Sequence, residues 1–120
     1  MRRGHIWTAS GGKDYACKLR PVVIVQDDSV DTTDSITVCA FTTDLTDVPL
    51  FRLPVEASTH DGLRAPCRLM VDKITTIQKF KLGTRIGRLV DEDLLRLNQA
   101  LLVLLGLAAT PRTRRSASVR

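Results

Sequence analysis

The fold of this chain is decided by the run Lys18-Leu19-Arg20-Pro21-Val22-Val23-Ile24-Val25. Its last four residues are all β-branched, which is typical of a strand. Because no polar residue interrupts them, we expect both faces of that strand to be covered. Pro21 fixes its own φ and holds the preceding residue extended. Arg20 is therefore expected at the mouth of a buried strand, where its planar guanidinium suits a phosphate. The alternative is a surface arginine paired with an acid.

Length and composition indicate one ordinary globular domain. The chain has 120 residues, of which 43% are hydrophobic and 26% charged, enough for a single core. The apolar cluster at residues 101–105 is too short to span a bilayer, and the N-terminus has no apolar segment of a secretory signal. Three widely spaced cysteines form no C-x-x-C pair, which predicts free thiols in a reducing cytoplasm, and neither a zinc site nor a disulfide framework.

Charge is unevenly distributed along the chain. The net charge is +5, and four arginines after residue 111 account for most of it. Within the body, five bases against a single acid in the first twenty residues are followed by a run of acids without bases, Asp27, Asp28, Asp31 and Asp34. A basic end and an acidic end on one small domain suggest a polyanion site on one side. The alternative is charged loops in water.

Alternating patterns and turn signals predict six short strands, at residues 4–9, 20–26, 36–42, 50–55, 67–71 and 85–90. Pro49 and Pro54 favour an edge position for the fourth strand. Residues 75–84 give no clear pattern. Strands with a single terminal helix predict a mainly β fold with a C-terminal helix (α+β), as a small β-barrel or a strongly curved sheet. We expect the domain to cover residues 1–110 and the basic tail, 111–120, to be disordered.

The helix is expected to start at Asp91 as N-cap and to end near Gly106. A buried stripe at helical spacing is predicted at Leu94, Leu97, Leu101, Leu104 and Leu105. Further apolar residues, Leu95, Leu102 and Val103, widen this face. The extra surface suits either a dimer contact or a fully buried helix.

Polar groups stand at three predicted strand ends. Arg20 precedes the second strand, Thr42-Thr43 ends the third, and Asp72-Lys73 follows the fifth. If these ends converge on one rim, a guanidinium, two hydroxyls and an ammonium form a cradle for a phosphate or oxyanion.

These motifs, taken in order, resemble the MazF/PemK/Kid family of toxin endoribonucleases. The resemblance extends over residues 2–107 and rests on five segments in register: residues 3–7, 18–25, 41–43, 72–77 and 86–89. It departs from the family at His5, where an acid is usual, at Lys73, where glutamine is frequent, and at Ala40-Phe41, where a proline is missing before the Thr-Thr pair.

The resemblance implies a homodimer of SH3-like barrels of the CcdB/Kid type that cuts single-stranded RNA, mRNA included, at short sequences without a metal or other cofactor. It implies a cognate MazE-like antitoxin of a type II toxin–antitoxin system, whose acidic segment covers a basic groove. By position, Arg20 and Thr42 are the catalytic residues. The 2′-OH would attack the adjacent phosphorus, giving a 2′,3′-cyclic phosphate and a free 5′-OH. The need for a 2′-OH explains a preference for RNA over DNA.

Around these two residues, RNA contacts are expected from Lys13, Tyr15, Lys18, Thr43, Asp72 and Lys73. Tyr15 is the candidate for stacking a base, against an exposed, uninvolved tyrosine. His5 is an available imidazole but is more in keeping with a structural role, and no convincing general base emerges.

Two other functions use the same fold. One is a gyrase-binding toxin like CcdB, although this chain lacks the C-terminal Trp-Gly-Ile of that protein and ends in Ala117-Ser118-Val119-Arg120. The other is an inactive barrel that binds RNA or protein. Loss of Arg20 or Thr42 would favour this second alternative, and both residues are present.

Overall fold

The computed structural model describes residues 1–10, 19–43, 51–56, 62–63 and 65–108. In chain order the elements are β1 (His5–Ser10), β2 (Leu19–Ile24), the 3₁₀ turn η1 (Asp28–Val30), β3 (Ser35–Thr42), β4 (Arg52–Val55), β5 (Cys67–Met70), η2 (Val71–Lys73), β6 (Thr75–Gln78), η3 (Lys79–Lys81), β7 (Leu82–Arg88) and α1 (Asp91–Leu104). The mainly β fold with one C-terminal helix is confirmed, and the segment without a clear pattern holds β6, η3 and the start of β7.

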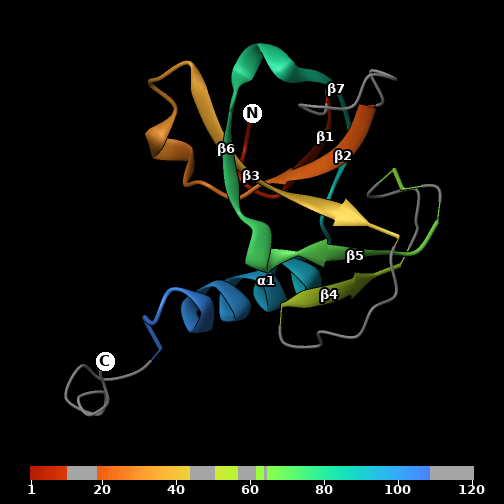
Figure 1. The fold of residues 1–120 in the computed structure, drawn as a ribbon, viewed down its shortest axis with the longest axis vertical. Helices are drawn as coiled ribbons and strands as arrows, with labels where there is room; N and C mark the ends of the chain where they lie inside the picture. The colour runs from red at the N-terminus through yellow and green to blue at the C-terminus, as the bar shows by residue number, and fades with distance from the viewer. Residues whose placement is uncertain (11–18, 44–50, 57–61, 64, 109–120) are drawn as a thin grey trace.

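The strands form one strongly curved antiparallel sheet (Figure 1). Its order is β4-β5-β3-β2-β1-β7, and β6 pairs with β3. Along one edge, β3 pairs with two strands. Its first half pairs with β6, and Phe41 and Thr42 near its end pair with β5. No pairing closes the sheet between β6 and β7 in the part of the chain that the structure describes, so the expected barrel is an open one. β4 lies at an edge, as its prolines predicted.

Strand β2 is buried on both faces, as its unbroken apolar run predicted. Val23 and Val25 pack into the larger core cluster with β4, β5 and α1. Val22 and Ile24 point the other way, into a second cluster with Ile36 and Val38 of β3. The curved sheet therefore has apolar side chains on both sides.

Helix α1 covers the larger cluster; it differs from prediction at its start and ends near Gly106 as predicted. Val90, not Asp91, is the N-cap residue, so Asp91 is the first residue of the helix. Its negative carboxylate there stabilises the helix, because the N-terminus is the positive end of the helix dipole. The C-terminus is a Schellman motif, in which Gly106 N–H donates to Val103 O at 3.1 Å and Leu107 N–H donates to Leu102 O at 2.8 Å. Gly106 has φ +76°, as a helix-ending glycine should.

The predicted stripe of α1 is only partly correct. Leu97 is fully buried, and Leu94, Leu101 and Leu104 pack against the core. Leu105 is 56% exposed because it stands beyond the last helical turn. The widening residues are exposed too, with Leu95 at 61%, which excludes a fully buried helix. The predicted tail at 111–120 lies outside the described residues. No described helix has the length and hydropathy needed to cross a membrane.

Candidate functional site

Arg20 and Thr42 lie at the same end of the sheet. In the β2–β3 ladder Val22 pairs with Ala40 and Val23 with Cys39. Extended by two residues, this antiparallel register sets Arg20 opposite Thr42. Figure 1 shows the start of β2 and the end of β3 on the same side of the molecule. The pairing of distant strands thus brings a cation and a hydroxyl to one edge.

The two side chains also belong to one face of the sheet. Side chains alternate along a strand, so Arg20 shares the face of Val22, and Thr42 shares the face of Ala40. Both of these neighbours pack with the second cluster. Arg20 is exposed and Thr42 is half-buried. A phosphate could therefore approach the edge from solvent and meet both groups.

A second arginine, which the sequence did not indicate, is a neighbour of Thr42 in the sheet. Arg68 of β5 is the direct partner of Thr42 across the β3–β5 ladder. Thr42 thus has an arginine-bearing strand on each side, with Arg20 on β2 and Arg68 on β5. The missed signal was strand direction, because an antiparallel fifth strand places its start, not its end, next to the end of the third.

The expectation that Asp72 and Lys73 share this edge is wrong. β5 begins beside Thr42 and runs away from it, so η2 lies at the other end of β5 (Figure 1). There the Arg52 Nε donates to Asp72 Oδ1 at 3.0 Å. This hydrogen bond lowers the pKa of the Asp72 carboxyl below its ordinary value. Asp72 therefore ties η2 to β4, and the geometry gives Lys73 no place in the phosphate cradle.

Replacing Asp72 by asparagine should consequently lower stability and leave RNA cleavage unchanged. Loss of the charge-assisted bond to Arg52 should lower the free energy of unfolding by about 1–2 kcal/mol. Urea unfolding measures this change, and Asp34→Asn serves as the control because Asp34 is exposed. A loss of RNA cleavage with unchanged stability would contradict this and show that Asp72 takes part in cleavage.

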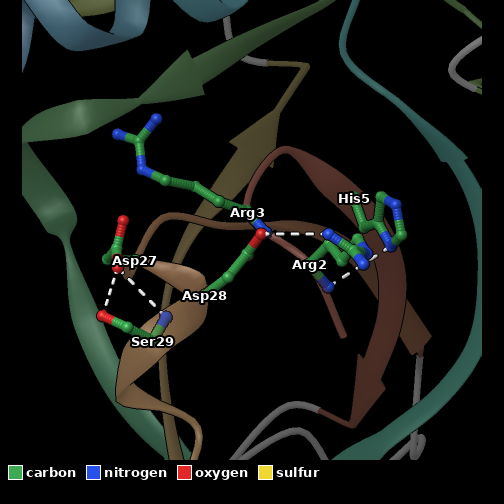
Figure 2. Close-up of polar contacts among 6 residues, drawn as sticks. All are labelled: Arg2, Arg3, His5, Asp27, Asp28 and Ser29. Atoms are coloured by element: carbon green, nitrogen blue, oxygen red, sulfur yellow. Dashed lines mark hydrogen bonds and ion pairs between the residues drawn. The ribbon is translucent and has the colours of Figure 1, made fainter.

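His5 lies at the opposite end of β1 from the arginine–threonine edge. Ala9 is the residue of β1 that pairs with Arg20, and four residues of strand separate His5 from it by about 13 Å. In Figure 2 the His5 Nδ1 accepts from the Arg2 backbone N–H, at 3.4 Å. At this distance His5 is not in contact with the arginine–threonine edge, and we still expect it to have a structural role.

The surroundings of His5 form a fixed basic corner. Asp28 accepts from the Arg3 backbone N–H at 2.6 Å and pairs with the Arg2 guanidinium at 3.4 Å (Figure 2). Arg3 Nε donates to Val25 O at 2.8 Å. Burial, followed by the charge of Arg85, lowers the pKa of His5 below its ordinary value of 6.5. Both effects favour the neutral form of the His5 imidazole.

Acid should destabilise the protein in two stages. The pKa of His5 is lower in the folded chain, so protonation favours unfolding and stability should fall as the pH drops below 6.5. The carboxyl pKa values of Asp27, Asp31 and Asp72 are also lowered, so their stabilisation is complete above 3.8 and is lost as the pH falls through the folded values. Thermal unfolding from pH 8 to pH 3 measures both stages. His5→Gln should abolish the first and keep the second, and identical profiles for the two proteins would contradict this assignment.

A cavity of about 490 Å³ opens beside the edge, on the other face of the sheet. Leu19 and Pro21 of β2, Thr43 after β3 and Leu63 contribute to its walls. Thr43 follows Thr42 and therefore points to the opposite face, which separates it from Arg20. At this wall the backbone of Gly62 approaches β7 so closely that only glycine fits, because a Cβ at Gly62 would lie 2.2 Å from Ile86 O. The cavity is large enough for a nucleobase.

The remaining predicted contacts, Lys13, Tyr15 and Lys18, lie outside the described residues. Within the described residues there is no group of three or more His, Cys, Asp or Glu side chains that could hold a metal ion. Burial raises the pKa of the Cys39 thiol to about 12, which makes it an inert part of the core.

Comparison with known proteins identifies the family of this chain. The profile of the PemK-like, MazF-like toxins of type II toxin–antitoxin systems matches residues 2–105. The chain belongs to this toxin family. A protein named "Probable endoribonuclease MazF" from Mycolicibacterium smegmatis is 48% identical over 108 residues, which cover 90% of this chain and 99% of that protein.

Solved structures support the fold of the toxin. The Mycobacterium tuberculosis toxin MazF-mt6 superposes with a TM-score of 0.71 at 27% identity, covering 85% of this chain and 96% of its own. An endoribonuclease from a mycobacterial species, solved in complex with its cognate antitoxin, has a TM-score of 0.71 at 23% identity and covers 92% of this chain and 99% of its own. The chain therefore has the fold of these solved toxins.

Proposed function

We propose that this protein is a toxin endoribonuclease that cuts single-stranded RNA at short sequences. The observation that carries the proposal is the shared edge of Arg20 and Thr42, which lie on adjacent strands and on one face of the sheet. Membership of the toxin family and the endoribonuclease named at 48% identity support the same activity.

In the proposed reaction, the 2′-oxygen attacks the adjacent phosphorus and the bond from phosphorus to the 5′-oxygen breaks. The 2′-hydroxyl proton leaves to solvent or a base, and the departing 5′-oxygen takes up a proton, giving a 2′,3′-cyclic phosphate and a 5′-OH. The Arg20 guanidinium stabilises the extra negative charge of the phosphorane, because it remains cationic throughout the reaction. Thr42 donates its hydroxyl to a non-bridging oxygen.

Arg20 gives this chain a permanent positive charge where the phosphorane forms. Preorganised cations of this kind stabilise developing charge without a proton transfer. We therefore propose cleavage that does not require a metal ion. Arg68, on the far side of Thr42, is placed to bind the next phosphate of the strand.

The proposed partners follow from the family and from the surface of α1. An antitoxin is the proposed protein partner, as in the mycobacterial complex, and its acidic segment would compete with RNA for the basic edge. The exposed apolar side chains of α1, among them Leu95, Leu102 and Val103, are proposed to pack in a homodimer. We propose the cytoplasm as the place of action, where mRNA is available.

Incubation of the purified protein with a long single-stranded RNA in EDTA tests the proposal. We expect discrete cuts with 5′-OH ends, which disappear in Arg20→Ala and Thr42→Val and return in Thr42→Ser because the hydroxyl is restored. Intact RNA together with gyrase inhibition would instead indicate a CcdB-like toxin. Intact RNA that is nevertheless bound would indicate a binding module.

A further inference from the structure

Phe80 is a large apolar side chain held in solvent. It is 78% exposed, the highest value among the exposed large hydrophobic residues of the described chain. It is the middle residue of η3, between Lys79 and Lys81. The surrounding segment, residues 73–90, contains five lysines and arginines and no carboxylate. An exposed ring in a purely cationic segment is not explained by the core or by the catalytic edge.

The turn that carries Phe80 is fixed on both sides. The Lys79 backbone N–H donates to Asp34 O at 2.7 Å, and the Lys79 ammonium pairs with Asp31. On the other side, the Ser10 hydroxyl lies 3.5 Å from Lys81 O. Because η3 is fixed at both ends, the ring is displayed at low entropic cost to a ligand.

η3 lies in line with the proposed catalytic arginine. Leu82, which follows η3 directly, pairs with Ala9 of β1, and Ala9 pairs with Arg20 of β2. These three residues therefore form one row across adjacent strands. Two strand spacings separate Leu82 from Arg20 by about 10 Å. Figure 1 shows η3 arching between β6 and β7 at the margin of the sheet. Phe80 thus stands beyond Arg20, on the side away from Thr42.

We propose that Phe80 is a stacking platform for a base of the RNA strand that flanks the cleaved phosphate. This inference rests on the proposed endoribonuclease function and adds a subsite to it. Single-stranded nucleic acids bind where an aromatic ring meets a base and nearby cations meet the backbone. Lys81 and the exposed Arg85 of β7 supply those cations.

A nucleic acid fits this surface better than a protein does. The exposed neighbours of the ring along the chain, Gln78, Gly83 and Thr84, are polar or have no side chain. Protein interfaces have an apolar core that excludes water, and the segment around Phe80 offers one ring only. Stacking needs no such core, since a single flat ring suffices.

Fluorescent RNA tests the platform directly. Cut sites of the wild-type protein are mapped first, and an RNA with a 2′-deoxy nucleotide at the cut is then made with 2-aminopurine at each flanking position in turn. We expect stacking to quench the fluorophore at one position beyond the cut. Phe80→Ala should remove this quenching and raise the Kd by roughly 5- to 150-fold. Phe80→Trp should keep both, and Val30→Ala, at another exposed apolar side chain of a 3₁₀ turn, should change neither.

The outcomes separate this inference from the proposed function. A wild-type protein that cuts RNA, with unchanged quenching and Kd in Phe80→Ala, would overturn the platform alone. Unchanged RNA binding together with weaker antitoxin binding, or with a monomeric Phe80→Ala protein in sedimentation, would likewise overturn it and make Phe80 a protein contact. A wild-type protein that neither cuts nor binds RNA would overturn both proposals.

Discussion

Arg20→Ala should lower the single-turnover rate of RNA cleavage by about 10²–10³-fold, the usual cost of losing one preorganised donor to a developing anion. The side chain is exposed, so the thermal unfolding temperature should stay close to that of the wild type. Arg20→Lys keeps the charge but loses the planar fork, and we expect an intermediate rate. Quench-flow measurement with a short RNA that contains one mapped cut site gives the three rates.

Arg68→Ala provides the matched control, because Arg68 flanks Thr42 on the opposite strand. We expect it to weaken RNA binding more than the rate at saturating protein, since it is placed at a neighbouring phosphate. An Arg20→Ala protein that cuts RNA at the wild-type rate would remove Arg20 from the chemistry. Equal rate losses in the two variants would mean that the roles of the two arginines are not distinct.

Gly62→Ala should lower the free energy of unfolding by about 2–4 kcal/mol, the combined cost of left-handed backbone and of overpacking. Gly62 has φ +73°, and its added Cβ would meet Ile86 O at 2.2 Å and Ile86 C at 2.9 Å. Both are backbone atoms of β7, so the clash cannot be relieved by rotation of a side chain. The segment carrying Leu63 would have to move, which would also deform the cavity beside the arginine–threonine edge.

Gly106→Ala is the control for this clash. Gly106 has a similar φ of +76°, yet an added Cβ would meet nothing within 4 Å. Urea unfolding of both variants should show a loss of about 1–2 kcal/mol for Gly106→Ala, from backbone strain alone, and a larger loss for Gly62→Ala. Equal losses would show that the close approach to Ile86 has no energetic weight.

Local pattern in the sequence was sufficient where one strong signal decided the structure. The β-branched run of β2 predicted burial on both faces, and the chain shows it at Val22 and Val23. Gly106 predicted the end of α1 because few other residues adopt its backbone conformation. Arg20 and Thr42 were correctly expected at strand ends, since Pro21 and the polar pair at Thr42-Thr43 mark those ends.

The local sequence pattern could not predict how distant strands pair. Asp72 was misplaced because nothing in its own segment tells which end of β5 lies beside Thr42, and the β3–β5 register decides this. The same register brings Arg68 to the site. The exposure of Phe80 was not predicted because the segment around it mixes short strands with a 3₁₀ turn, so neither a period of two nor one of 3.6 emerges.

The proposed mechanism requires Arg20 and Thr42 to act on the same phosphate. A crystal structure of the protein with an RNA blocked by a 2′-deoxy nucleotide at the cut tests this most directly. We predict that the Arg20 guanidinium and the Thr42 Oγ1 each lie within about 3.2 Å of oxygens of the scissile phosphate. A scissile phosphate bound elsewhere, for example against Lys73 at the far end of β5, would contradict the account.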